Sequence, residues 1–172
     1  YTIALLHPFN PPQRPTMRPL YIFDIDGTIC DITHRLHFLD NITDKGRWKK
    51  FYRACVSDET NDPVIATMEA LRKDADIWFF SGRSAEVRYE TLMWLHVHTS
   101  FKMDQMATNP EWLTMRMEND FTEDHLLKQS WLLGMLDVDR QRLVAIFDDR
   151  KRVVDMWREN GVPCFQVAAG EF

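Results

Sequence analysis

The sequence predicts an α/β fold, a three-layer αβα arrangement of the Rossmann type around a mostly parallel sheet. Three observations predict it. Short apolar runs of strand length alternate with longer segments of helical periodicity. The runs are apolar on both faces, which is typical of parallel strands covered by helices on both sides. Finally, the length of 172 residues and the hydrophobic content of 45% suit one globular domain with a substantial core.

The expected strands are short and are separated by segments long enough to hold a crossover helix. The first run, Leu20-Tyr21-Ile22-Phe23, ends at an aspartate. The others fall at 77–80, 143–147 and 164–167, with a weaker run at 112–117.

Start and stop signals predict four helices between these strands. Asp62-Pro63 supplies an N-cap and a first-turn proline for a helix over 64–73. Ser84 precedes a helix over 85–95, and the acidic stretch at 122–124 opens one over 125–136. A last helix over 151–160 ends at Gly161, which can adopt the left-handed conformation of a helix stop.

Two segments fall outside this alternation. Residues 1–16 contain four prolines that forbid a helix and no signal-peptide pattern, so we expect a tail or an expression-derived leader before a natural start at Met17. A native arm that packs its apolar residues on the domain is the equal alternative. Residues 17–172 then form a single domain. Within it, residues 31–61 predict a small insertion with helical pieces near 32–39 and 47–56, above the carboxyl edge of the sheet.

Charge and cysteine content restrict the function classes. A formal net charge of −5 argues against broad attraction to nucleic acid, although a local basic groove remains compatible with it. Three widely spaced cysteines without a CxxC pair indicate reduced thiols and a cytoplasmic location. No apolar run approaches about 18 residues, so we expect no membrane partner.

Acidic side chains gather where strands end. Asp24 and Asp26 follow the first strand, and strand alternation predicts that they point the same way. Asp148 and Asp149 follow the strand at 143–147. Ligands of doubly wound sheets bind at this edge, and clustered carboxylates need a cation between them. The four carboxylates therefore predict a Mg²⁺ site.

The same edge collects groups suited to phosphate oxygens. Ser81-Gly82-Arg83 ends another strand, and a helix between the strands contributes Lys128. A hydroxyl, a lysine and an arginine around a metal are what a phosphoryl group needs. The pattern predicts phosphoryl chemistry.

These residues resemble the haloacid dehalogenase (HAD) superfamily of phosphotransferases, whose fold the alternation also matches. DxDGT at Asp24–Thr28 resembles the first motif of that superfamily, Ser81 the second, Lys128 the third and Asp148-Asp149 the fourth. A closer resemblance is to the 3′-phosphatase domain of phage polynucleotide kinase. It rests on Ser81–Arg83, Met115-Arg116, Asp124-x-x-x-Lys128, the C-terminal stretch from Ile146, and Arg35 nine residues after Asp26.

This chain departs from that resemblance in two places. It contains no GxxxxGK[ST] phosphate loop, so the kinase half is missing. The insertion around 47–56 also looks longer.

The resemblance implies a role for each residue. Asp24 is implied as the nucleophile that forms an aspartyl-phosphate, and Asp26 as the general acid and base. Lys128 is implied to bridge nucleophile and phosphate, with Asp124 orienting it. Ser81, Gly82, Arg83, Arg35 and Arg116 are implied to bind substrate. The plainer alternatives are a turn cap for Asp24 and Asp26, a helix cap for Asp148 and Asp149, and ordinary ion pairs for Lys128, Arg83 and Arg116.

The segment KGRWKKFYR, residues 45–53, interleaves basic and aromatic residues. One interpretation is an amphipathic helix that docks by its aromatic side chains and leaves a solvated basic face. The other is a surface that stacks bases and follows phosphates above the site.

The sequence therefore predicts a Mg²⁺-dependent phosphomonoesterase. The favoured substrate is the 3′-phosphate of a DNA or RNA end, because a small insertion leaves the site open to a polymer. The alternative is a free nucleoside monophosphate, which the acidic net charge favours. A non-catalytic nucleic-acid-binding module is a remote third hypothesis, since every motif position carries a reactive residue.

Overall fold

The computed structural model describes residues 17–170, and the expectation for residues 1–16 lies outside that part of the chain. Its centre is a five-stranded sheet in the order β5-β4-β1-β6-β7, with every neighbouring pair parallel. The α/β fold predicted from the sequence is confirmed. The strands are β1 (Leu20–Phe23), β4 (Asp76–Ser84), β5 (Leu113–Arg116), β6 (Leu143–Arg150) and β7 (Cys164–Gly170).

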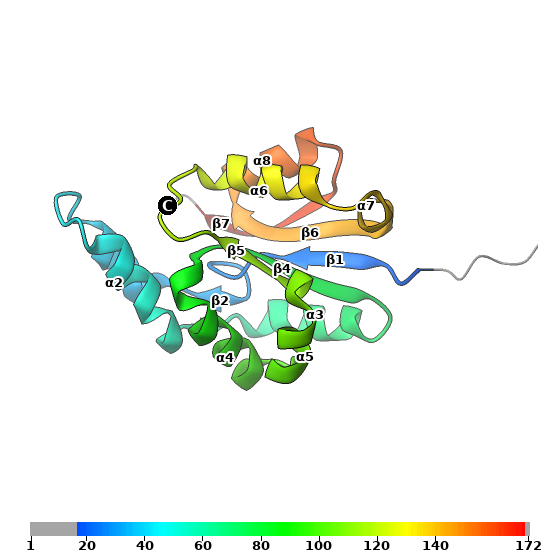
Figure 1. Ribbon diagram of the computed structural model, residues 1–172, viewed down its shortest axis with the longest axis horizontal. Helices are drawn as coiled ribbons and strands as arrows, with labels where there is room; N and C mark the ends of the chain where they lie inside the picture. The colour runs from blue at the N-terminus through cyan, green and yellow to red at the C-terminus, as the bar shows by residue number, and fades with distance from the viewer. Residues whose placement is uncertain (1–16, 171–172) are drawn as a thin grey trace, which may run out of the picture.

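Helices cover both faces of this sheet (Figure 1). On one face lie α3 (Asp62–Arg72), α4 (Arg88–His98) and α5 (Met103–Thr108). On the other lie α6 (Asp124–Gly134), α7 (Asp137–Arg142) and α8 (Lys151–Glu159). The strand order reverses at β1, with β4 on one side and β6 on the other. Such a switch point opens a crevice at the carboxyl ends of the strands.

The central strand shows why the sheet is buried on both faces. Leu20 and Ile22 belong to one hydrophobic core, and Phe23 belongs to the other. Phe23 stacks on Phe147 of β6 with ring centroids 4.3 Å apart. Successive side chains of a strand point to opposite faces, so an uninterrupted apolar run supplies both cores.

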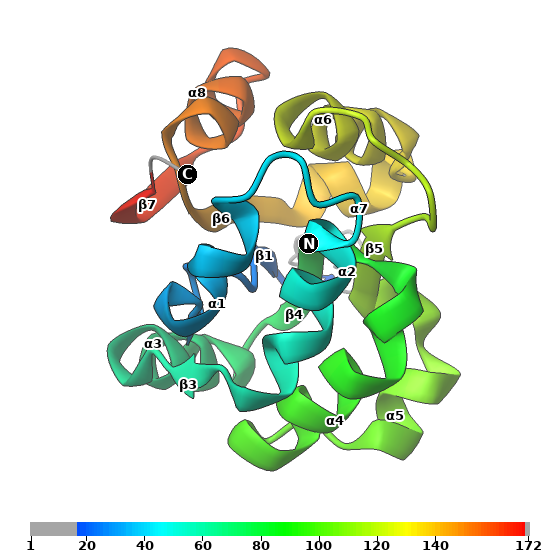
Figure 2. The ribbon, with the colours of Figure 1, turned by 90° about the vertical axis from the view of Figure 1, so that its left-hand side faces the viewer.

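The insertion between β1 and α3 lies beyond the carboxyl ends of the strands (Figure 2). The helical pieces expected there correspond to α1 (Thr33–Leu36) with a following 3₁₀ turn, and α2 (Arg47–Arg53) with another. A two-stranded antiparallel ribbon of β2 (Cys30–Asp31) and β3 (Glu59–Thr60) ties its ends together.

Some helices and strands of the structure were not predicted from the sequence. The ribbon strands have two residues each, and α5 and α7 have six each, too few to show a clear hydrophobic period. Helix α3 begins at Asp62, so that Asn61 and not Asp62 takes the N-cap position. Of the described helices, none is long and apolar enough to cross a bilayer.

Candidate active site

A pocket lies at the carboxyl edge of the sheet, and residues of the insertion line part of it. Its floor includes Asp24 and Asp26, which follow β1, and Asp148 and Asp149 of β6. Its walls come from α2 and from the loop between β5 and α6. The four predicted acids therefore meet at one edge, as the parallel topology requires.

Three of these acids form a compact group. Asp24, Asp148 and Asp149 are buried and offer one carboxylate oxygen each, all within 4.8 Å of one another. Burial, with repulsion from Asp148 and Asp149, raises the pKa of Asp24 well above its usual value despite the attraction of Lys128. Burial and Asp148 raise the pKa of Asp149 to about 6. A divalent cation would relieve this repulsion, so the donor set fits Mg²⁺.

The backbone comes close to Asp149 at Gly27. Gly27 has a φ of +80°, and a Cβ there would lie 2.3 Å from Oδ2 of Asp149. A side chain at position 27 would therefore fill the space that this carboxylate uses. Position 27 therefore requires glycine for two reasons: the positive φ of the turn, and the short distance to the carboxylate of Asp149.

Lys128 lies at the centre of the acids and is itself 1% exposed. Its Nζ donates to Oδ1 of Asp24 at 2.7 Å and to Oδ2 of Asp148 at 2.9 Å. Asp124, one turn earlier in α6, lies 3.5 Å from the same nitrogen. Burial would favour the neutral amine, but the three acids outweigh it and raise the pKa of Lys128. Lys128 therefore carries a positive charge next to the nucleophile predicted from the sequence.

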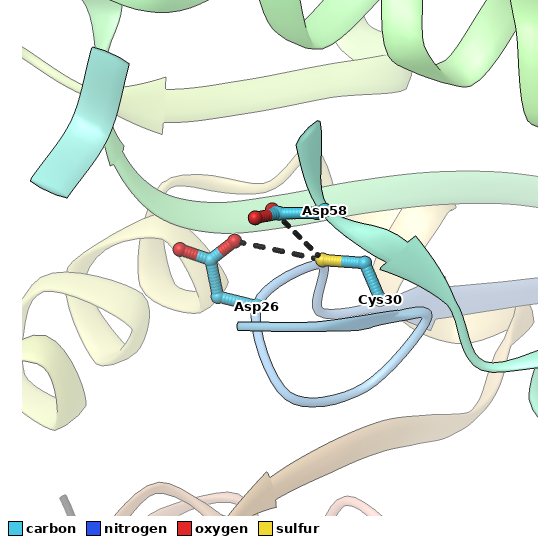
Figure 3. Close-up of side chains that lie close together, drawn as sticks. All are labelled: Asp26, Cys30 and Asp58. Carbon is cyan, nitrogen blue, oxygen red and sulfur yellow. Dashed lines mark hydrogen bonds between the residues drawn. The ribbon is translucent and has the colours of Figure 1, made fainter. Parts of the chain in front are cut away.

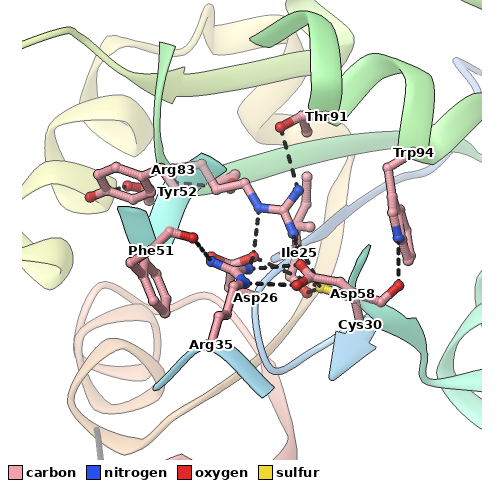
Figure 4. Close-up of polar contacts among 12 residues, drawn as sticks. Ile25, Asp26, Cys30, Arg35, Phe51, Tyr52, Asp58, Arg83, Thr91 and Trp94 are labelled. Atoms are coloured by element: carbon pink, nitrogen blue, oxygen red, sulfur yellow. Dashed lines mark hydrogen bonds and ion pairs between the residues drawn. The ribbon is translucent and has the colours of Figure 1, made fainter. Parts of the chain in front are cut away.

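Asp26 binds a different set of partners. Its Oδ1 accepts from Arg35 Nη2 at 2.7 Å and from Arg83 Nε at 2.6 Å (Figure 4). Burial opposes ionisation of Asp26, but Arg83 and Arg35 outweigh it and hold its pKa below the usual value. The regular strand does not extend to Asp26, because β1 ends at Phe23 and Asp26 pairs with Cys30 in an isolated bridge. The side chain of Asp26 stands outside the compact acidic group, and its role as a metal ligand stays a prediction.

Arg35 and Arg83 are fully buried beneath Asp26, and they are not among the pocket-lining residues. From this position the two arginines can orient the carboxylate of Asp26. The direct contact with the substrate phosphate that the sequence predicted for them is less favoured. Both arginines also bind Asp58, a buried acid that follows the second 3₁₀ turn of the insertion. Sequence reasoning missed Asp58, because a lone aspartate in a loop carries no motif.

Asp26, Cys30 and Asp58 form a second group of ligand-type side chains (Figure 3). Oδ2 of Asp58 is 3.3 Å from the sulfur of Cys30 and 2.5 Å from Nη2 of Arg83. Two guanidinium groups already neutralise the two carboxylates. The arrangement is that of an ion cluster, and it does not fit a cation.

The other predicted substrate contacts are divided between the pocket and the core. Gly82 lines the pocket, whereas Ser81 is fully buried and its hydroxyl accepts from the backbone N–H of Arg83 at 3.3 Å. Arg116 lines the pocket and donates to the carbonyls of Gly82 and Thr122 at 2.9 and 2.6 Å. It thus braces the loop that forms one wall.

The opposite wall is the basic and aromatic helix α2. Phe51 is buried, and Tyr52 directs its hydroxyl toward the carbonyl of Gly82 at 3.5 Å. Trp48 is 41% exposed and lines the pocket with Lys45 and Lys49. The helix therefore docks by some aromatic side chains and presents another to the pocket, and the interpretation of 45–53 as a base-stacking surface stays a prediction.

Comparison with known proteins gives concordant matches. The family model for the "Polynucleotide kinase PNKP phosphatase domain" matches residues 18–172. A relative from Autographa californica nuclear polyhedrosis virus, the "Putative bifunctional polynucleotide kinase/RNA ligase", is 31% identical over 142 residues. That match covers 81% of this chain and 18% of the relative.

Two solved structures share the fold. A chain of the Pnkp1/Rnl/Hen1 RNA repair complex matches with a TM-score of 0.66 and 26% identity, over 98% of this chain and 49% of that one. A chain of a second Pnkp1/Rnl/Hen1 complex matches with a TM-score of 0.63 and 27% identity, over 98% and 53%. The chain thus spans about half of the solved chains it matches, and less of the viral relative.

Proposed function

We propose, from the premise that this chain belongs to the polynucleotide kinase phosphatase domain family and is a phosphatase, that it removes the 3′-phosphate from a nucleic-acid end. The observation that carries this proposal is the buried Lys128 bound to Asp24 beside a group of acids sized for a cation. The reaction is Mg²⁺-dependent and passes through an aspartyl-phosphate, an acyl phosphate on Asp24.

The acidic group would hold the metal through Asp24, Asp148 and Asp149. Mg²⁺ bound there would supply positive charge next to the phosphoryl oxygens. Lys128 supplies a second positive charge from the protein, opposes the effect of burial and the neighbouring acids on the ionisation of Asp24, and orients its carboxylate. Asp24 attacks phosphorus, and the bond from phosphorus to the 3′ oxygen of the sugar breaks.

Asp26 moves the proton in both halves of the reaction. It gives a proton to the departing 3′ oxygen, and it later takes one from the water that attacks the phospho-aspartate and releases inorganic phosphate. Its two arginine partners favour the ionised form. The half-reaction in which Asp26 accepts a proton is therefore the one that this geometry supports most directly.

A polymer end suits the pocket walls. Trp48 of α2 is 41% exposed, lines the pocket and offers a flat surface for a base. Lys45 and Lys49 offer cations for the phosphates that follow. The names of the matched proteins, which combine kinase, ligase and repair functions, lead us to propose cytoplasmic repair of broken ends before ligation.

One observation favours a free nucleoside monophosphate instead. The loop between β5 and α6 carries Glu118, Asp120 and Glu123, which line the pocket and would repel a polyanion. We therefore place the strand along α2, away from this loop.

A substrate panel tests the proposal. Phosphate release is measured from a 3′-phosphorylated oligonucleotide, from the same oligonucleotide with a 5′-phosphate, and from 3′- and 5′-mononucleotides, each with and without EDTA. We expect the highest kcat/KM on the 3′-phosphorylated oligonucleotide and no turnover in EDTA. Preference for mononucleotides would make the chain a nucleotidase, and no release from any ester would leave only the binding-module hypothesis.

A further inference from the structure

Asp58 lies beside Asp26 in the buried ion cluster of Figure 4, and Arg35 and Arg83 join the two acids. We propose that Asp58 is a positioning residue for the reaction, which acts through Arg35 and Arg83 to set the orientation of the Asp26 carboxylate. This inference rests on the proposed function of Asp26 and assigns a role to a residue outside the family motifs.

Arg35 joins the two acids. Its Nε and Nη2 donate to the two oxygens of Asp58, each at 2.7 Å. The same Nη2 donates to Oδ1 of Asp26 at 2.7 Å. A guanidinium held by a two-point contact of this kind has a fixed plane, so Asp58 sets the direction in which Nη2 of Arg35 points its second N–H.

Arg83 makes the same connection from β4. Its Nε donates to Oδ1 of Asp26 at 2.6 Å, and its Nη2 donates to Oδ2 of Asp58 at 2.5 Å. Both arginines therefore bind the same oxygen of Asp26. The other oxygen of Asp26, Oδ2, makes neither of these bonds. The side chain of Asp26 is 16% exposed and lines the pocket, so Oδ2 can face the substrate.

Asp58 is itself held in place from several directions. Its side chain is 0% exposed, and its backbone carbonyl accepts from the indole N–H of Trp94 at 2.9 Å. Nε2 of His34 lies 2.9 Å from Oδ1, and the sulfur of Cys30 lies 3.3 Å from Oδ2. The insertion and α4 thus anchor the acid from which both arginines are aimed.

Charge balance makes Asp58 necessary. The cluster contains two guanidinium groups and two carboxylates without solvent exposure of either arginine. Without Asp58, both cations would be left to Asp26 alone, and a buried charge without its partner is strongly unfavourable. We expect the arginines to shift, and the Asp26 carboxylate to lose its orientation with them.

A double-mutant cycle separates this role from a purely structural one. Asp58→Asn is measured alone and in an Asp26→Asn background, with kcat and KM for p-nitrophenyl phosphate and a 3′-phosphorylated oligonucleotide. We expect Asp58→Asn to lower kcat by about 10–100-fold with little change in KM, but by less than about 3-fold in the Asp26→Asn background. Asp31→Asn, which changes an exposed acid of β2 in the same insertion, should leave kcat unchanged.

Equal losses of kcat in both backgrounds, a wild-type kcat, or a change in KM alone would overturn the proposal. If Asp58→Asn does not fold, Trp94→Phe decides, because it removes the N–H that holds Asp58 and keeps the charges. It should lower kcat less, and again only when Asp26 is present. The cycle can use any ester that the wild-type protein hydrolyses, so its outcome is separate from that of the substrate panel.

Discussion

Nζ of Lys128 lies 2.7 Å from Oδ1 of Asp24, although 104 residues separate the two in the chain. The contact joins α6 to the end of β1 and places a buried ammonium group next to the carboxylate that we assign as the nucleophile.

Asp24→Asn should abolish phosphate release while leaving the free energy of unfolding within about 1 kcal/mol of wild type. The amide cannot attack phosphorus, and burial beside other acids already disfavours the charge of Asp24. Phosphate release and urea denaturation measure the two quantities. Asp74→Asn, an exposed acid, is the control, and turnover at the wild-type rate in Asp24→Asn would remove Asp24 from the nucleophile role.

Lys128→Met should lower kcat by about 10²–10³-fold, because it removes the positive charge nearest to the nucleophile. It should also lower Tm, since Asp24 and Asp148 lose a buried donor. Mg²⁺ should restore part of that Tm. Scanning calorimetry with and without Mg²⁺ and a kinetic assay test this, with the exposed Lys151→Met as control. A kcat within a few-fold of wild type would mean that Lys128 only balances charge.

Mg²⁺ should raise the Tm of the wild-type protein. At ten times the dissociation constant the stabilisation is about 1.4 kcal/mol, which corresponds to roughly 3–6 °C at this size. Asp149→Asn should lose most of this shift because Asp149 belongs to the compact acidic group. Asp26→Asn should keep it, because the side chain of Asp26 binds arginines. Loss of the shift in Asp26→Asn would restore the four-carboxylate site predicted from the sequence.

Gly82→Ala should lower kcat by about 10-fold or more. A Cβ at position 82 would lie 2.5 Å from Oδ1 of Asp124, which is 3.5 Å from Lys128 through its other oxygen. Displacing Asp124 should misplace Lys128. Gly134→Ala is a matched control in α6, because no atom lies within 4 Å of the added carbon. It should leave kcat unchanged and stabilise the fold by about 0.5–1 kcal/mol.

Trp48→Ala should raise KM for a 3′-phosphorylated oligonucleotide by about 5–100-fold, as expected for the loss of one stacked base. KM for p-nitrophenyl phosphate should stay constant because that ester has no base. Tyr89→Ala, an aromatic residue of α4 that is 65% exposed, is the control. Equal changes for both substrates would indicate that Trp48 supports α2 and does not contact a base.

Comparing the site with the sequence shows which inferences local patterns support. The apolar runs and their acidic ends predicted the parallel sheet and the meeting of Asp24 with Asp148 and Asp149. This succeeded because carboxyl ends of parallel strands share one edge, whatever the loops do. The position of Lys128 followed from motif resemblance, since spacing alone is compatible with an exposed ion pair.

The arginines and Asp58 show where such inference ends. Arg35 and Arg83 were expected at the substrate, and the structure buries both beneath Asp26. No local pattern separates a buried arginine from an exposed one.

By itself, the sequence determined which acids follow which strands. It also indicated, through its motifs, that a phosphatase of this kind needs these acids in one site. Only the tertiary structure decided that the side chain of Asp26 lies outside the group of Asp24, Asp148 and Asp149, that two arginines hold it, and that Asp58 holds the arginines. The physical reason is that strand ends are set by short-range hydrophobic periodicity. Buried ion pairs depend on the packing of segments distant in the chain, which no local period encodes.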